Sequence, residues 1–355
     1  MAIIFLTAPV QHYCPGSNDT CCDNPVYNTS VFKRTIITEW NLICERDWLK
    51  DLTQTIFQFG VFCGSLLFGI ASDKWIWKKT DFDDIDNIRN ICRHDVIVFA
   101  GFLELFVCQM GGWFCKWGMY NHSIRLGDGI RWTKKPRSTA LDLFRTPHLR
   151  TNITVMSFVW LVCSYCFYGV TYYIGHLTGN IFINVLATGG VCTCAVIISI
   201  PLIKFYKRKT VVVFGNVICS LCLLTMGFVP EGKATLVVGC IGEMHSYIIF
   251  IVIYLYCSEM FPTVVRNAAI GICSMVARVG AMIAPFAASL HIYGKWCSPV
   301  AFGIFPMISA FLCLLLLPET KDCELLVTLE EAENLGRKIQ ISRSDNSLNF
   351  EESEV

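Results

Sequence analysis

Charged side chains are scarce in this chain. Asp, Glu, Lys and Arg make up 16% of its 355 residues, whereas about a quarter is usual in soluble domains. The 29 basic and 28 acidic residues nearly cancel, to a formal net charge of +1, so electrostatics do not favour nucleic acid as a partner. The seven His residues lack the spacing of metal ligands, and no glycine-rich phosphate loop follows a strand. We therefore expect no metal, no cofactor and no enzymatic activity.

Apolar residues, by contrast, are abundant and lie in long blocks. They make up 54% of the chain, and the mean hydropathy is +0.51. Blocks of about twenty apolar residues match the thickness of the hydrocarbon core of a bilayer. We predict an all-α transmembrane protein whose first helix covers residues 52–72. Six further helices are predicted over residues 154–176, 181–206, 210–229, 234–256, 268–290 and 298–317.

Basic residues indicate the orientation of these helices, because loops rich in Lys and Arg stay in the cytoplasm. The basic loops are residues 74–79, 145–150 and 204–209, with Arg266. With these loops inside, residues 80–135 must cross the membrane an even number of times. The apolar run at residues 96–114 is therefore expected to lie on the membrane surface or to fold poorly, and the alternative is that it spans.

Most of the twenty cysteines lie in apolar runs, where cysteine acts as a small hydrophobe. Four others share a polar N-terminal stretch with two N-glycosylation sequons. They are Cys14, Cys21, Cys22 and Cys44, and the acceptor residues of the sequons are Asn18 and Asn28. We predict an extracellular, glycosylated and disulfide-bonded segment, with three possible pairings of the cysteines. The alternative is a segment that is reduced and not glycosylated.

Four motifs point to one known family. The longest is CSEMFPTVVRNAAIGICSMVARVGAMIAPF, at residues 257–286. The others are EWNLICERDWLKDLTQTIFQFGVFCGSLLFG at residues 39–69, LDLFRTPHLR at residues 141–150 and LLPETK at residues 316–321. Together they resemble the organic cation, anion and carnitine transporter family of the major facilitator superfamily.

The resemblance implies a fold of twelve helices in two halves of six. By motif, this chain keeps helix two and the C-terminal six-helix half, whereas helices three to six are not recognisable. A chain that passes from helix two to the C-terminal half without helices three to six resembles the product of an alternative transcript, or a gene model that crosses an intron boundary. The expected segments are an extracellular segment at residues 1–51, a helix with a basic loop at 52–79, a mostly cytoplasmic connector at 80–150, the six-helix half at 151–318 and a cytoplasmic tail at 319–355.

The resemblance also implies a function. Members of the family are multi-pass proteins of the plasma membrane that carry small organic ions by alternating access. The substrate would be an organic cation, a carnitine-like zwitterion or an organic anion. A second interpretation rests on the missing helices, because a transport cavity needs two halves that rock about one site. The chain would then be a non-transporting product that is inactive or regulates a full-length transporter.

Arg278 is the first candidate for substrate binding. It lies near the middle of a predicted helix, where a guanidinium facing lipid would cost several kcal/mol, and it can bind a carboxylate through two hydrogen bonds. In the family that the chain resembles, Arg at this position is typical of anion and carnitine carriers, and Asp is typical of cation carriers. An anionic or zwitterionic substrate is therefore favoured. The alternative is a permanent ion pair between Arg278 and an acid such as Glu243.

Glu243 and His245 are two more ionisable residues at mid-membrane depth, and could relay protons or contact an ammonium group. Tyr165, Tyr168 and Tyr172 recur at helical spacing and offer rings to a bulky organic ion. The alternative for these tyrosines is helix packing and anchoring at the membrane interface.

Candidate gating residues lie at the cytoplasmic ends of the helices. Asp73 and Lys74 match part of a loop motif of the family, in which an acid beside bases joins two helix ends through charge contacts. Ile76 stands where relatives carry glycine, and a plain basic anchor is the alternative reading of this loop. We add Glu259 and Arg266 of the long motif as gating candidates.

Overall fold

The computed structural model describes most of the chain outside one long central segment. The described residues are 35–75, 142–175, 180–230, 232–263 and 265–321. Scattered positions before residue 35, at residue 177 and between residues 330 and 333 are also described. For residues 65–75 only the backbone is described. The predicted connector and its apolar run at residues 96–114 therefore lie outside the described residues. The chain divides into two compact units, Met1–Gln58 with Ser138–Val355, and Phe59–Arg137.

The N-terminal segment forms a small ordered structure before the first long helix. Strand β1 (His12–Tyr13) pairs antiparallel with β2 (Val26–Tyr27). Helix α2 (Ile36–Trp40) begins at a capping box, in which the side chains of Thr35 and Thr38 bond to each other's backbone N–H. The short helix η1 (Cys44–Arg46) leads into α3 (Trp48–Trp75), so the helix predicted over residues 52–72 is present.

Six long helices make up the C-terminal part, as predicted. They are α7 (Pro147–Gly175), α8 (Ile181–Phe205), α9 (Arg208–Met226), α10 (Lys233–Met260), α11 (Arg266–Ser289) and α12 (Cys297–Leu316). Two short helices, α6 (Asp142–Arg145) and η2 (Leu290–Ile292), flank this set. Within the part of the chain that the structure describes, these six helices are long and apolar enough to cross a membrane. The main difference from the prediction is that α7 begins at Pro147, a residue suited to the first turn of a helix.

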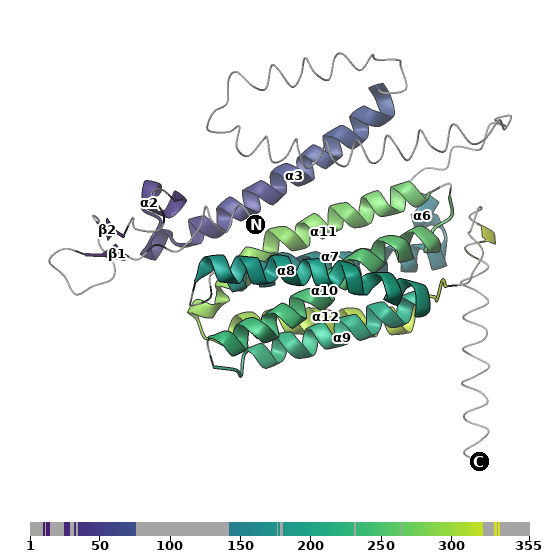
Figure 1. The fold of residues 1–355 in the computed structure, drawn as a ribbon. Coiled ribbons are helices and arrows are strands. Elements are labelled where there is room, and N and C mark those ends of the chain that lie inside the picture. Colours follow the sequence, from purple (N-terminus) through teal and green to yellow (C-terminus); the bar gives the residue numbers. More distant parts are fainter. Residues whose placement is uncertain are drawn as a thin grey trace. The chain divides into compact units, whose positions relative to one another are not determined.

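Helix α7 is central to the six-helix bundle. It packs against α11, α12, α10 and α8, while α9 packs against α10 and α12; Figure 1 shows these helices side by side. The buried side chains form two clusters along the length of α7. One surrounds Trp160, Ile249 and Tyr256, and the other surrounds Val170, Leu223 and Phe302.

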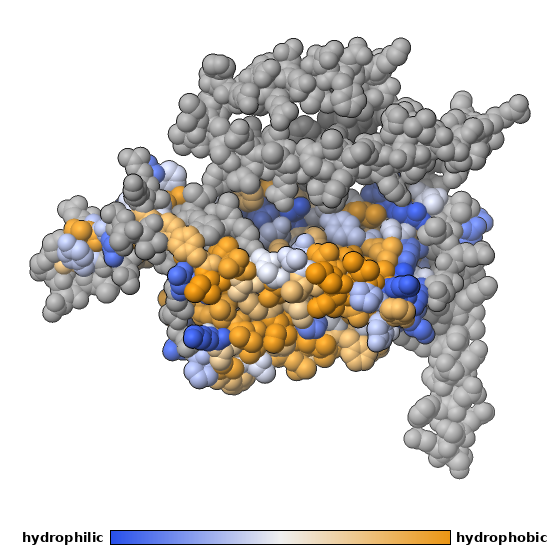
Figure 2. Space-filling model, in the orientation of Figure 1, coloured by the Kyte–Doolittle hydropathy of each residue, from blue (hydrophilic) through white to orange (hydrophobic). Residues whose placement is uncertain are grey.

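The outer surface of the bundle is apolar. Figure 2 shows hydrophobic side chains over much of its visible face, with polar residues gathered near the helix ends. Leu186 and Ile200 of α8 and Phe311 of α12 are all more than half exposed. A contiguous apolar surface of this kind is suited to lipid, and the helices satisfy their own backbone hydrogen bonds as a membrane requires.

Close approach of α11 to α7 depends on a small residue. A Cβ atom added at Gly280 would overlap the backbone carbonyl oxygen of Leu161. The backbones of the two helices therefore touch at this point, as is common where small residues line a contact between membrane helices. Gly271 of the same helix differs, since a Cβ atom there would meet no atom within 4 Å.

Replacing Gly280 by Ala should separate α11 from α7. Overpacking of this kind costs about 1–3 kcal/mol, so we expect a lower melting temperature in detergent and less monodisperse protein. Gly271→Ala is the matched control on the same helix and should leave the melting temperature unchanged or slightly higher. Equal melting temperatures for the two variants would contradict the close contact of α7 with α11.

Candidate functional site

Arg278 lies half-buried near the middle of α11 and faces α7. Its Nη1 atom is 3.5 Å from the hydroxyl oxygen of Tyr168, a long hydrogen bond. The ion pairs found among the described residues join Lys50 to Asp47, His148 to Glu333 and Arg208 to Glu259. Arg278 thus has no carboxylate partner within the described part of the chain.

Glu243 of α10 is fully buried and is held by α7. The hydroxyl of Thr171 donates a 2.5 Å hydrogen bond to Oε1 of Glu243, while Oε2 is buried and has no hydrogen-bond partner among the described residues. The structure does not bring Glu243 and Arg278 together, so the alternative of a permanent ion pair between them finds no support in this conformation.

His245 does not join Glu243 either. The two residues are two positions apart on one helix, so their side chains are rotated by about 200° from each other around the helix axis. The Nδ1 atom of His245 lies 2.9 Å from the carbonyl oxygen of Ile241, one turn earlier in α10. A direct proton relay between Glu243 and His245 therefore does not exist in this arrangement.

The three candidate tyrosines of α7 share one helix face but have three different partners. The buried Tyr165 donates a 3.2 Å hydrogen bond to the carbonyl oxygen of Ala301 in α12, and its ring packs against Phe302. Tyr172, also buried, bonds to Asp51. Only Tyr168 contacts Arg278. The structure therefore places Tyr168 beside Arg278, whereas Tyr165 contacts α12 and Tyr172 contacts α3.

An aromatic face that the sequence analysis missed continues from Tyr168. We define this face as Trp160, Phe167 and Tyr168 of α7 with Tyr247, Phe250 and Tyr254 of α10. The ring centroids of Phe167 and Tyr247 are 5.3 Å apart, and those of Trp160 and Tyr254 are 4.3 Å apart. All of these rings except Trp160 are half-buried. The signal was present in the sequence as aromatic residues at positions i, i+3 and i+7 of α10.

Arg278 and the aromatic face make a mixed surface in the middle of the bundle. A guanidinium can bind a carboxylate or sulfate through two hydrogen bonds, and aromatic faces can stack on a flat substrate or attract an organic cation. Because the cation has no acid partner among the described residues, the arrangement favours a ligand that carries a negative group next to an apolar body.

A second polar cluster joins the start of α9, the end of α10 and the segment after α12. Glu259 at the end of α10 forms an ion pair with Arg208 at the start of α9, with 3.2 Å between Oε1 and Nη2. The Thr320 hydroxyl donates to Oε2 of Glu259 at 2.7 Å, and Oε1 of Glu319 accepts from the backbone N–H of Arg208 at 3.0 Å. The segment after α12 is thereby tied to α9 and α10.

Arg266, another gating candidate, has contacts of its own at the start of α11. Nε of Arg266 donates to the carbonyl oxygen of Phe261 at 3.2 Å, and its Nη2 atom is buried without a hydrogen-bond partner among the described residues. Asp73 and Lys74 lie in the last turns of α3, but their side chains are outside the described residues.

A third polar cluster, also missed from the sequence, lies at the opposite end of the bundle. The carboxylate of Asp51 in α3 is buried and accepts hydrogen bonds from Tyr172 of α7, at 2.9 Å, and from Ser289 of α11. Thr55 donates to the carbonyl oxygen of Met282 at 2.9 Å. The sequence signal was a polar stripe at helical spacing in an otherwise apolar helix: Asp51, Gln54 and Gln58, all buried.

The N-terminal candidates are only partly described. Cys14 and Cys44 are disulfide-bonded, and Asn28 is exposed. Asn18, Cys21 and Cys22 lie outside the described residues. Which of the three possible pairings of the four cysteines forms therefore stays open.

Comparison with known proteins identifies the family. The model of the family "Sugar (and other) transporter" matches residues 131–335, more than half of the chain. The frog protein "Solute carrier family 22 member 15-like" from Xenopus tropicalis is 32% identical, over 98% of this chain and 92% of its own length. This chain belongs to solute carrier family 22 of the major facilitator superfamily. It is therefore a multi-pass membrane protein of a family of organic-ion transporters, not of a family of enzymes.

Two further relatives are solute transporters by name. The "Organic cation transporter protein" of Drosophila melanogaster is 26% identical, over 91% of this chain and 78% of its own length. "Solute carrier family 22 member 12" of the mouse is 24% identical, over 96% and 80%. An inward-open structure of the xylose transporter XylE from E. coli is 15% identical, covers 82% of this chain and 66% of that chain, and has a TM-score of 0.42.

The lengths of two of these alignments carry further information. The alignments with the frog and fly proteins run over 456 and 433 positions, whereas this member of the family has 355 residues. Both relatives therefore contain internal segments that have no counterpart in this chain.

Breaking the Asp51 cluster should loosen α3 from the bundle. Tyr172→Phe removes one hydrogen bond to the carboxylate, and bonds of this type contribute about 1.5–3 kcal/mol, so the melting temperature should fall. Tyr293→Phe, at a position that is 84% exposed, is the control and should have no effect. In a double-mutant cycle with Asp51→Ala, the two effects should not add, because one interaction is removed twice. If the two changes in stability are additive, the hydrogen bond between Tyr172 and Asp51 contributes nothing to the stability of the protein.

Proposed function

We propose that this chain carries small organic ions across the plasma membrane by alternating access, and that Arg278 with the aromatic face contacts an anionic or zwitterionic substrate. The observation that carries the proposal is the half-buried Arg278 in the middle of a membrane helix, with a tyrosine hydroxyl and no carboxylate beside it among the described residues. Such a cation is stable in a membrane protein when water or an anionic ligand reaches it. The family supports transport, and the site supports the sign of the substrate charge.

Alternating access requires contacts at the two helix ends that form and break in turn. The Glu259–Arg208 cluster is suited to the cytoplasmic side, since its members come from α9, α10 and the segment after α12. The Asp51 cluster is suited to the extracellular side, since it joins α3 to α7 and α11. We infer that the first holds the cytoplasmic ends of the six-helix half together and the second closes the outside. Asp73, Lys74 and Arg266 stay proposed gating residues on the family motif alone.

A second function is favoured by a different observation, the internal segments that the relatives contain and this chain lacks. If those segments are helices three to six, the half that faces Arg278 in a complete carrier is missing. The chain would then be a membrane product that does not transport, and a full-length transporter would be the partner that covers the exposed site.

Uptake distinguishes the two functions. Cells that express the chain should accumulate labelled carnitine or benzoate more than mock cells, and tetraethylammonium less strongly, because the site presents a cation to the substrate. Signal at the level of mock cells for all three compounds, with the protein present at the surface, would reject transport and leave the second function. Co-purification with a full-length family member would then test the partner.

Arg278 should decide the charge preference. We expect Arg278→Asp to lower uptake of benzoate at least ten-fold and uptake of tetraethylammonium less than two-fold, because the attractive charge is reversed only for the anion. Arg278→Lys keeps the charge and is the matched control, with partial loss from the missing second hydrogen bond. Equal losses for the anion and the cation in Arg278→Asp would remove the assignment of substrate charge.

The cytoplasmic cluster can be tested without transport. Glu259→Arg and Arg208→Glu each place two like charges together, and each should lower the melting temperature in detergent. The double variant restores an opposite pair in reverse order and should recover much of the loss. A double variant that is no more stable than the worse single variant would show that the pair does not hold α9 to α10.

A further inference from the structure

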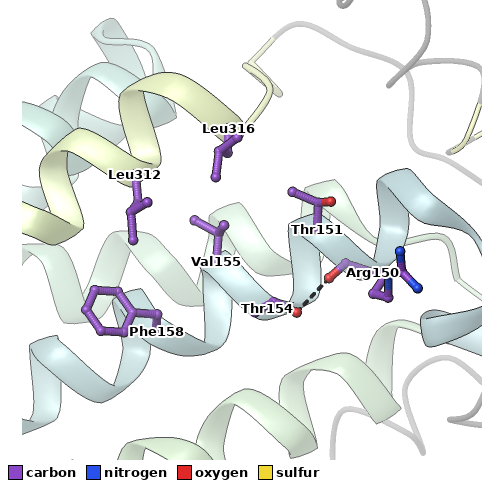
Figure 3. Close-up of a pocket in the computed structure, with 7 residues that line it drawn as sticks. All are labelled: Arg150, Thr151, Thr154, Val155, Phe158, Leu312 and Leu316. Carbon is purple, nitrogen blue, oxygen red and sulfur yellow. Dashed lines mark hydrogen bonds between the residues drawn. The ribbon is translucent and has the colours of Figure 1, made fainter.

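A pocket of about 500 Å³ opens on the bundle surface between α7 and α12, and its lining includes neither Arg278 nor any residue of the aromatic face. Three polar residues line one part of it: Arg150, Thr151 and Thr154. Four apolar residues line the rest: Val155, Phe158, Leu312 and Leu316. Figure 3 shows Arg150 at one end, and Phe158 with Leu312 at the other.

The polar and apolar parts are arranged in order along the membrane normal. Arg150, Thr154 and Phe158 are spaced four residues apart, so they form one line on α7. Eight residues of helix rise about 12 Å, so the Cα atoms of Arg150 and Phe158 are separated by most of the hydrocarbon thickness of one leaflet, which is about 15 Å. The basic end belongs to the side that the positive loops place in the cytoplasm. The pocket thus runs from the inner membrane surface into the apolar layer.

Arg150 is available to a ligand in a way that Arg208 and Lys209, at the start of α9, are not. It is exposed, and within the described ranges its side chain forms no ion pair. Arg208 is paired with Glu259, and Lys209 donates to the carbonyl oxygen of Leu317 at 2.8 Å. The hydroxyls of Thr151 and Thr154 bond to carbonyl oxygens of their own helix, and each can rotate to donate to an anion beside Arg150.

We propose that this pocket binds one phospholipid of the inner leaflet. The lipid phosphate contacts Arg150 and the hydroxyl of Thr154, and one acyl chain lies along Phe158, Leu312 and Leu316. A soluble anion would use the polar end and leave the four apolar residues uncovered, whereas a lipid matches both parts in the order in which the membrane presents them. A net-anionic headgroup such as phosphatidylserine is favoured, since its additional carboxylate leaves a net negative charge next to Arg150, whereas phosphatidylcholine is neutral overall. The proposal does not depend on transport.

The test uses the full chain in detergent, titrated with phosphatidylserine and with phosphatidylcholine while bound lipid is counted by native mass spectrometry. We expect one retained phosphatidylserine, bound more tightly than phosphatidylcholine. Arg150→Gln should weaken its binding at least five-fold. Lys204→Gln removes an exposed base from the same cytoplasmic end of the bundle and should change the binding less than two-fold. Equal effects of the two variants would overturn the proposal, because they would show only a general attraction to basic loops.

A second variant tests the apolar part. Thr154→Trp, at an exposed position, should fill the pocket and displace the lipid without lowering the melting temperature. Retention of the lipid by a folded Thr154→Trp would overturn the proposal. Displacement of the lipid by millimolar inorganic phosphate would do the same, because the site would then bind a soluble anion. Thr154→Cys that forms a disulfide dimer in membranes and excludes lipid would show that another protein chain covers this face.

Discussion

Polar groups inside an apolar solvent need partners, and this requirement explains most of the organisation of the protein. The backbone meets it by forming helices. The side chains meet it through contacts between helices: Thr171 donates to Glu243, Tyr172 and Ser289 donate to Asp51, and Arg208 pairs with Glu259. Each contact joins two elements, so the same bonds that remove the cost of burial also set which helices are neighbours. Helix α7 takes part in the first two and touches α11 at Gly280, which is why it is central.

Several polar groups do not meet this requirement within the described residues, and two ionisable groups near the middle of their helices stand out. Oε2 of Glu243 has no hydrogen-bond partner, and Arg278 has only a long hydrogen bond to a tyrosine. In a carrier, groups of this kind find partners in substrate, water or the opposite half at some stage of the cycle. Their position beside a row of half-buried rings agrees with the organic-ion chemistry of solute carrier family 22. The absence of internal segments found in relatives makes the opposite half the central question for this chain.

The polar clusters at the two ends of the bundle are built in the same way. Each is built from side chains of several helices that meet only when the ends are close, and each consists of a carboxylate with hydroxyl or guanidinium donors. Such bonds are strong when dry and weak when water enters, so they suit contacts that must break. The pocket at Arg150 differs, because its cation is exposed at the membrane boundary and its floor is apolar. That difference is why a lipid fits it and a gating contact does not.

The sequence by itself determined the all-α membrane class, the six C-terminal helices and the family, because helix length, hydropathy and motifs are local properties of the chain. It also singled out Arg278, since a cation inside an apolar run is conspicuous from the sequence alone. Only the tertiary structure decided which residues meet. It separated His245 from Glu243, divided the three tyrosines among three partners, and revealed Asp51 and the ring face of Tyr247, Phe250 and Tyr254. Spacing along one helix shows which side chains share a face, but the identity of the facing helix depends on packing between residues far apart in the chain.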